Sequence, residues 1–306
     1  MKVGVVQQTC WEDKQKSLAE SERLINELAE QGVELILLQE LHATQYFCQT
    51  EDLQYFDLAE PLQGPTTQKL SELAKKHQCV IVGSIFEKRM AGVFHNTAVV
   101  LEKDGSLAGC YRKMHIPDDP GFYEKFYFTP GDAQRTDLKN QNAFQPIKTS
   151  VGNLGVLVCW DQWYPEAARL MALAGADILL YPTAIGWDQD DTIDEQQRQL
   201  NAWTTIQKSH AVANHLPVLV ANRIGHENDP SGQTKGSLFW GNSFICGPQG
   251  EILANANDKE CVALVAEIEY QRTEYLRQIW PFLRDRRIDA YSPIVNRVNL
   301  RNNNEE

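Results

Sequence analysis

Short runs of consecutive apolar residues alternate along the chain with longer segments in which apolar positions recur every three or four residues. The runs at 3–6 and 33–38 are typical of strands that are buried on both faces. Residues 17–29 have the helical pattern, and Gly32 ends it. The beginning of the chain therefore predicts a strand, a helix and a second strand.

The same alternation continues toward the C-terminus. We predict further strands at 79–86, 96–102, 107–114, 154–158, 177–181, 218–221, 244–246, 252–254 and 262–268. We predict further helices at 66–77, 165–174 and 194–214. This pattern, with several strands adjacent in sequence, predicts an α/β fold in which helices cover mixed sheets. We predict one domain over residues 1–306, with a C-terminal arm from about 270 to 306.

Charge and cysteine content narrow the class of protein. The 306 residues have a net charge of −12, which repels nucleic acid and attracts small cations. The seven cysteines include no CxxC pair, which is typical of a reducing compartment. We find neither a signal peptide nor an apolar run long enough to span a membrane, so we expect a cytoplasmic protein without membrane contact.

Three predicted strands end in a residue suited to chemistry: Glu40, Lys113 and Cys159. A sheet can bring such strand ends together at one edge. A nearby helix N-terminus and a lysine both favour the reactive thiolate form of a cysteine, and a glutamate can act as a general base. Taken singly, each has a simpler interpretation, namely a small buried apolar residue for Cys159 and surface charges for the other two.

The context of these three residues resembles the nitrilase superfamily of carbon–nitrogen hydrolases. The segments that carry the resemblance are Leu38-Gln-Glu40, Tyr111-Arg-Lys-Met-His-Ile-Pro117 and Val158-Cys-Trp-Asp-Gln-Trp-Tyr-Pro-Glu166, in the order the family has them. The resemblance implies a four-layer αββα sandwich. It also implies a homodimer, or a larger homo-oligomer built from dimers, in which the C-terminal arm reaches over the partner. No cofactor and no metal are expected.

Within the superfamily, the chain resembles the N-carbamoylputrescine amidase branch. The segments that carry this resemblance are 159–169, 181–186, 124–128, 222–225 and 282–287. The branch implies hydrolysis of N-carbamoylputrescine to putrescine, CO2 and ammonia. The chain departs from the expected pattern after Gly186, where it reads Trp187-Asp-Gln-Asp-Asp191.

The resemblance implies a role for each catalytic candidate. Cys159 is expected to attack the carbamoyl carbon, while Lys113 and a backbone N–H hold the developing oxyanion. Glu40 is expected to move the protons, and a covalent intermediate is then released by water. Glu124, which matches a second glutamate of the family, is expected to orient Lys113 and the substrate.

A pocket for a substrate with an ammonium group needs a carboxylate and an apolar wall. We predict Asp188 and Asp190 as the candidates for the charge. The candidates for the wall are Trp187, Tyr46, Phe47 and Trp160. The simpler alternative is that the acidic residues are solvated and the aromatic residues only pack.

Two other functions stay open. A related hydrolase of N-carbamoyl-β-alanine, of N-carbamoyl amino acids or of ω-amides would need a cationic pocket, for which Arg223 is the candidate. A non-catalytic binding subunit is the second alternative. Such a subunit is expected to have lost a catalytic residue, whereas this chain keeps all three.

Overall fold

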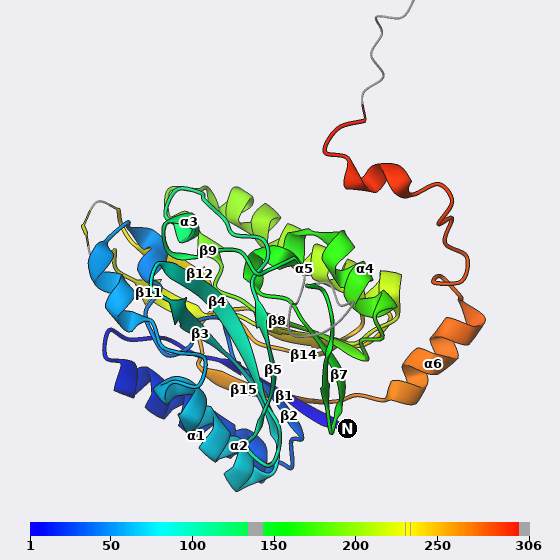
Figure 1. Ribbon diagram of the computed structural model, residues 1–306, viewed down its shortest axis with the longest axis horizontal. Helices are drawn as coiled ribbons and strands as arrows, with labels where there is room; N and C mark the ends of the chain where they lie inside the picture. The colour runs from blue at the N-terminus through cyan, green and yellow to red at the C-terminus, as the bar shows by residue number, and fades with distance from the viewer. Residues whose placement is uncertain (134–142, 230, 233, 300–306) are drawn as a thin grey trace, which may run out of the picture.

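The computed structural model describes residues 1–133, 143–229, 231–232 and 234–299. Residues 134–142 and 300–306, which belong to a predicted irregular stretch and to the predicted arm, lie outside the described residues. The ribbon contains two large sheets with helices along two opposite sides (Figure 1).

The first sheet has six strands in the order β15-β1-β2-β3-β4-β5. Their bounds are Val262–Glu267 for β15, Lys2–Gln7 for β1, Leu35–Leu37 for β2, Val80–Met90 for β3, Val93–Leu101 for β4 and Leu107–Arg112 for β5. Strands β1, β2 and β3 are parallel, and the other pairings are antiparallel. The carboxyl end of β2 therefore opens at the same edge as the carboxyl ends of β1 and β3.

The second sheet also has six strands, in the order β14-β13-β10-β8-β7-β6. Their bounds are Ile252–Asn255 for β14, Phe244–Cys246 for β13, Val218–Ala221 for β10, Ile178–Pro182 for β8, Gly152–Val156 for β7 and Ile147–Thr149 for β6. Parallel strands β7, β8 and β10 form its centre. Both sheets are thus mixed, with a parallel centre and antiparallel edges.

Helices begin where the local sequence provides a capping side chain or a proline. Helix α1 (Lys14–Glu30) follows Asp13, whose carboxylate accepts the N–H of Gln15, and α2 (Pro65–His77) has a proline in its first turn. Helix α4 (Pro165–Leu173) also begins with proline. Helix α5 (Ile193–Asn214) is capped by the Thr192 hydroxyl.

Alternate side chains of the central strands face two different cores. Val5 of β1 belongs to the buried cluster that also contains Val156 and Leu180 of the second sheet. Its neighbour Val6 belongs to the cluster that contains Leu28 of α1 and other helical residues. Because the strands are buried on both faces, their sequences are continuously apolar. The layers run α, β, β, α, which confirms the predicted fold class.

Smaller elements complete the chain. Strands β9 (Gly186–Trp187), β11 (Ile224–Glu227) and β12 (Ser237–Trp240) form a separate three-stranded sheet that the apolar pattern did not predict.

The remaining elements are short helical segments and the C-terminal residues. The short helical segments are η1 (Phe47–Gln49), η2 (Leu53–Leu58), α3 (Glu124–Tyr127), η3 (Cys159–Trp163) and η4 (Ser292–Val295). Helix α6 (Tyr270–Ile279) lies near the end of α5, where Arg277 donates to the carbonyl of Asn214 at 3.0 Å, and the residues that follow, up to 299, extend away from the layers (Figure 1). No helix in the described ranges is both long and apolar enough to cross a membrane.

Candidate active site

Glu40 lies just beyond β2, where the chain turns sharply. The next residue, Leu41, has a φ of 48°, in the left-handed region that residues other than glycine rarely adopt. The guanidinium of Arg223 donates hydrogen bonds of 3.0 Å to the carbonyl oxygens of both Glu40 and Leu41. A buried cation therefore holds the turn that positions the Glu40 carboxylate.

Lys113 lies just beyond β5 and joins two carboxylates. Its Nζ is 2.8 Å from Glu40 Oε1 and 2.6 Å from Glu124 Oε2, and all three side chains are buried. Asn96 also donates to Glu40 Oε1, at 2.6 Å. Among the described residues, Glu40 Oε2 has no hydrogen-bond partner. One oxygen of the carboxylate is thus fixed, while the other is available to accept a proton.

Burial disfavours the charged forms of the side chains in this cluster, whereas ion pairing between them favours the charged forms. Burial lowers the pKa of Lys113, but the charges of Glu124 and Glu40 outweigh this effect and hold that pKa well above its ordinary value. The amine therefore stays protonated. Burial raises the pKa of Glu124 to about 7, although the Lys113 charge and a 2.7 Å hydrogen bond from the Tyr46 hydroxyl lower it.

Cys159 begins η3 at the strand end beyond β7. Its φ is 46°, so this residue too occupies the left-handed region. The Asp161 carboxylate stabilises the turn by accepting the N–H of Val158 at 2.9 Å. Its other oxygen accepts the N–H of His115 at 3.0 Å and lies 2.6 Å from the imidazole Nδ1. Asp161 therefore connects the Cys159 turn to the segment that follows Lys113.

The pKa of the Cys159 thiol depends on burial and on the charges of the Lys113 cluster. Burial raises the pKa of Cys159 well above its ordinary value, the Glu40 charge raises it further, and the Lys113 charge lowers it only in part. The sulfur donates to the Ala184 carbonyl at 3.7 Å. Burial and the Glu40 charge thus outweigh the Lys113 charge, which by itself would favour the thiolate. The proton must leave when the sulfur reacts.

A cavity of about 390 Å³ lies over this cluster. The residues that shape it include Cys159, Trp160, Trp163, Ala184, Trp240 and Asp119. Asp119 is the only charged side chain on its wall in the described part of the chain. Glu40 and Lys113 are fully buried and do not line this cavity. Cys159 therefore reaches the cavity and interacts electrostatically with the buried charges.

A family model described as carbon–nitrogen hydrolase matches residues 2–278. The chain belongs to the carbon–nitrogen hydrolase family. The resemblance to the nitrilase superfamily is thereby confirmed.

This carbon–nitrogen hydrolase is similar to several named proteins over nearly its whole length. It is 41% identical to the N-carbamoylputrescine amidase of Oryza sativa subsp. japonica, covering 96% of this chain and 94% of that protein. It is 38% identical to a citrullinase of Francisella tularensis, covering 96% and 98%. The crystal structure of a carbon–nitrogen hydrolase from Helicobacter pylori G27 superimposes with a TM-score of 0.92 at 52% identity, covering 98% and 99%.

The predicted acidic residues do not lie on the Cys159 cavity of this hydrolase. Asp188 and Asp190 are exposed and line a neighbouring hollow, and Asp190 forms an ion pair with Lys235. Trp187 lines the same hollow, and its Nε1 donates to the carbonyl of Gln196 at 3.0 Å. These three residues thus line a hollow that shares Pro120 and Phe122 with the Cys159 cavity, and their contact with the substrate stays a prediction.

The predicted aromatic wall is only partly where the sequence indicated. Trp160 does line the cavity. Tyr46 is buried and donates to Glu124, so it belongs to the charged cluster and not to the wall. Phe47 is buried in an aromatic core, with its ring centroid 5.0 Å from that of Phe86. Trp240, which sequence reasoning missed, supplies a wall from β12.

Sequence reasoning also missed Asn96, Asp161 and Asp119. Asp161 belongs to the Cys-Trp-Asp segment, and its position two residues after Cys159 was the one available signal. Asn96 and Asp119 carry no local signal, because their neighbours are set by tertiary packing. Among the described residues, no group of three or more His, Cys, Asp or Glu side chains is placed to hold a metal ion.

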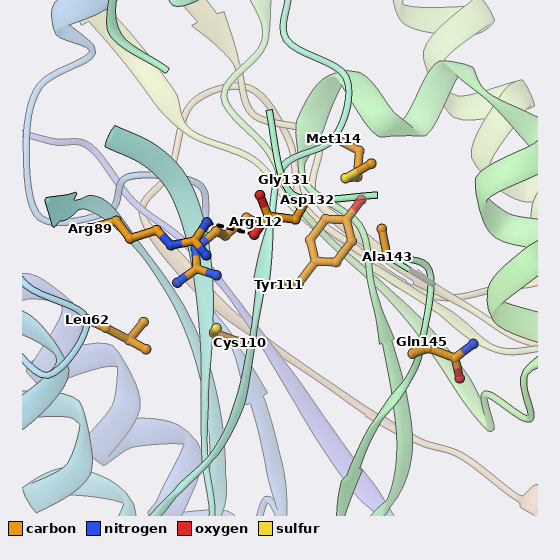
Figure 2. Close-up of a pocket in the computed structure, with 10 residues that line it drawn as sticks. All are labelled: Leu62, Arg89, Cys110, Tyr111, Arg112, Met114, Gly131, Asp132, Ala143 and Gln145. Atoms are coloured by element: carbon orange, nitrogen blue, oxygen red, sulfur yellow. Dashed lines mark hydrogen bonds and ion pairs between the residues drawn. The ribbon is translucent and has the colours of Figure 1, made fainter. Parts of the chain in front are cut away.

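A second cavity, of about 290 Å³, lies beside β5 and is lined by Arg89, Arg112, Cys110 and Asp132 (Figure 2). Both cations on its wall have anionic partners. Arg89 is 2.7 Å from Asp132, and Arg112 is 2.7 Å from the buried Glu87. None of the predicted catalytic residues lines this cavity, so it is separate from the candidate active site.

Proposed function

We propose that this carbon–nitrogen hydrolase converts N-carbamoylputrescine to putrescine, CO2 and ammonia. The observation that carries the proposal is the buried Glu40–Lys113–Glu124 cluster behind Cys159. It provides a fixed cation and a carboxylate oxygen without a hydrogen-bond partner in the described chain. The similarity to plant N-carbamoylputrescine amidases supports the choice of substrate.

In the proposed first step, the sulfur of Cys159 attacks the carbamoyl carbon. Glu40 takes the thiol proton as the S–C bond forms, and the oxyanion is held by protonated Lys113 and the N–H of Trp160. The C–N bond to the leaving nitrogen then breaks, and Glu40 returns the proton to that nitrogen. The product of this step is a thiocarbamate on Cys159 and a free amine or ammonia.

In the second step, water attacks the thiocarbamate. Glu40 removes one proton from the water, the C–S bond breaks, and the proton returns to the sulfur. The released carbamic acid loses CO2 and frees the remaining nitrogen. Glu124 does not need to touch the reacting atoms, because it already holds Lys113 Nζ at 2.6 Å. Its role in the proposal is to keep the cation aimed at the oxyanion.

Arg223 does not support a pocket for anionic substrates. It is fully buried, forms an ion pair of 2.8 Å with Glu227, and donates to backbone carbonyls. N-Carbamoyl-β-alanine, other N-carbamoyl amino acids and ω-amides that carry a carboxylate would therefore lack a cationic partner there. Citrulline is the second candidate substrate, since a citrullinase is similar over nearly the full chain.

A turnover comparison tests the proposed function. Ammonia release is measured with N-carbamoylputrescine, citrulline and N-carbamoyl-β-alanine, using the intact chain and Cys159→Ala. We expect the highest kcat/KM for N-carbamoylputrescine and background release by the folded Cys159→Ala variant. A higher kcat/KM for either other substrate contradicts the proposed substrate. Turnover by Cys159→Ala contradicts the mechanism.

We also propose that the chain forms a homodimer, or a larger assembly built from dimers, in the reducing cytoplasm. Several large apolar side chains of residues 270–299 are exposed, including Ile279, Trp280 and Ile294. Leu170 and Leu173 of α4 are exposed as well. Exposed apolar surface of this extent is typical of an interface. Sedimentation of the intact protein measures the assembly.

A further inference from the structure

The wall of the Cys159 cavity is mostly apolar and aromatic, with Trp160, Trp163 and Trp240 among its residues. Asp119 is the exception, as the sole charged side chain on the wall within the described ranges. No described residue forms an ion pair with it. A single carboxylate on an apolar wall favours a cationic ligand group and disfavours an anionic one.

The backbone around Asp119 is fixed by a tight turn. The N–H of Phe122 donates to the Asp119 carbonyl at 2.8 Å, with Pro120 and Gly121 between them. Gly121 has a φ of 80°, which is the conformation that this position of a type II turn requires. The sequence Asp-Pro-Gly-Phe therefore provides a turn of defined shape at the rim of the cavity.

The same turn is connected to the buried charges. Phe122 also lines the cavity, and its ring centroid is 5.5 Å from that of Tyr46. Tyr46 donates its hydroxyl hydrogen to Glu124. The turn that contains Asp119 therefore packs, through Phe122 and Tyr46, against the cluster behind Cys159.

Other acidic residues near the cavity are excluded by their contacts. Glu40 and Glu124 are engaged by Lys113. Asp118 is 3.8 Å from Lys125, and Asp190 is paired with Lys235. Asp188 lines the neighbouring hollow and accepts the N–H of Asp190. Asp119 is exposed, as Asp188 and Asp190 are, but of these three only Asp119 lines the Cys159 cavity, so it is the carboxylate best placed to meet a ligand there.

We propose that Asp119 binds the terminal ammonium group of the substrate and sets the preference of the enzyme for cationic ureides. This inference rests on the proposed function, since the substrate must place its ureido carbon at Cys159. The aromatic wall would pack against the methylene groups and stabilise the cation further. A ureide that ends in a carboxylate would instead meet a like charge.

The test compares N-carbamoylputrescine with N-butylurea, a neutral compound with the same ureido group and four-carbon chain. The measured quantity is the ratio of the two kcat/KM values. In Asp119→Asn we expect this ratio to fall roughly 10- to 100-fold, mainly through KM for the cation, because a charged hydrogen bond is lost. The matched control, Asp188→Asn with Asp190→Asn, removes two nearby exposed charges and should change the ratio less than about twofold.

An unchanged ratio in Asp119→Asn overturns the inference. An equal loss with both substrates also overturns it, because the effect would then be structural and not a matter of charge. If the ratio of the two kcat/KM values falls as far in the control as in Asp119→Asn, the assignment of the ammonium site to Asp119 is refuted, and the 188–190 loop becomes the site. If the unchanged chain does not hydrolyse N-carbamoylputrescine, the proposed function fails by itself, independently of the variants.

Discussion

The carboxylates behind Cys159 and those of the 188–190 loop differ in their surroundings. Glu40 and Glu124 are buried and share one lysine, whereas the Asp190 side chain is 73% exposed and pairs with a surface lysine. Water and salt screen the exposed pair, so it contributes little to binding or stability. In the buried cluster, the charges of Glu124 and Glu40 hold the pKa of Lys113 well above its ordinary value. Surroundings, more than residue type, therefore decide which carboxylates can act as proton acceptors or hold a buried cation here.

The largest expected effect is that of Glu40→Gln. Glutamine cannot accept the thiol proton, so kcat should fall about 10²–10⁴-fold. Asp188→Asn, which changes a carboxylate in the exposed loop, is the matched control and should stay within about twofold. Steady-state kinetics with N-carbamoylputrescine measure both. Equal effects in the two variants would abolish the distinction between the two groups.

Asp161→Asn should have the next largest effect. Asp161 accepts N–H groups of both Val158 and His115, and an asparagine amide has only one acceptor oxygen. One of the two segments should therefore shift, and kcat should fall roughly 10- to 100-fold. Because Asp161 does not line the cavity, KM should change little. Circular dichroism checks the fold, and a rise in KM with unchanged kcat would contradict a positioning role.

Tyr46→Phe should give the smallest of these effects and a change in pH dependence. The lost hydroxyl lowers the pKa of Glu124, which is about 7, so the variant should have a higher value. Glu124 holds Lys113 when charged, hence activity should rise with pH through this pKa. In the variant this rise in activity should occur at higher pH. Activity should therefore be roughly fivefold lower than that of the unchanged chain near pH 7, and the difference should become smaller at alkaline pH.

The control for this change is Tyr275→Phe, since Tyr275 is half exposed and lies on α6. Its profile of kcat/KM against pH should match that of the unchanged chain. A Tyr46→Phe profile that only falls in height, with no displacement along the pH axis, would show that Glu124 does not depend on this hydrogen bond.

The apolar pattern predicted an α/β fold with mixed sheets and the strand-end residues, because continuous apolar runs identify strands buried on both faces. The four layers were implied by the resemblance to the nitrilase superfamily. It did not predict β9, β11 and β12, which are short and pair only with one another. The position of Trp240 depends on that small sheet, and the placement of Asp188 depends on the path of β9. Tertiary contacts between distant segments set these positions, so no local pattern contained them.

The pairing of β1 with β15 has a consequence for biosynthesis. During synthesis, strand β1 finds its antiparallel partner only when Val262–Glu267 has been made. Until then, the apolar edge of Lys2–Gln7 is an unsatisfied template that can recruit another nascent chain. Such long-range closure slows folding, and chaperone supply should therefore limit the yield of native enzyme during rapid expression.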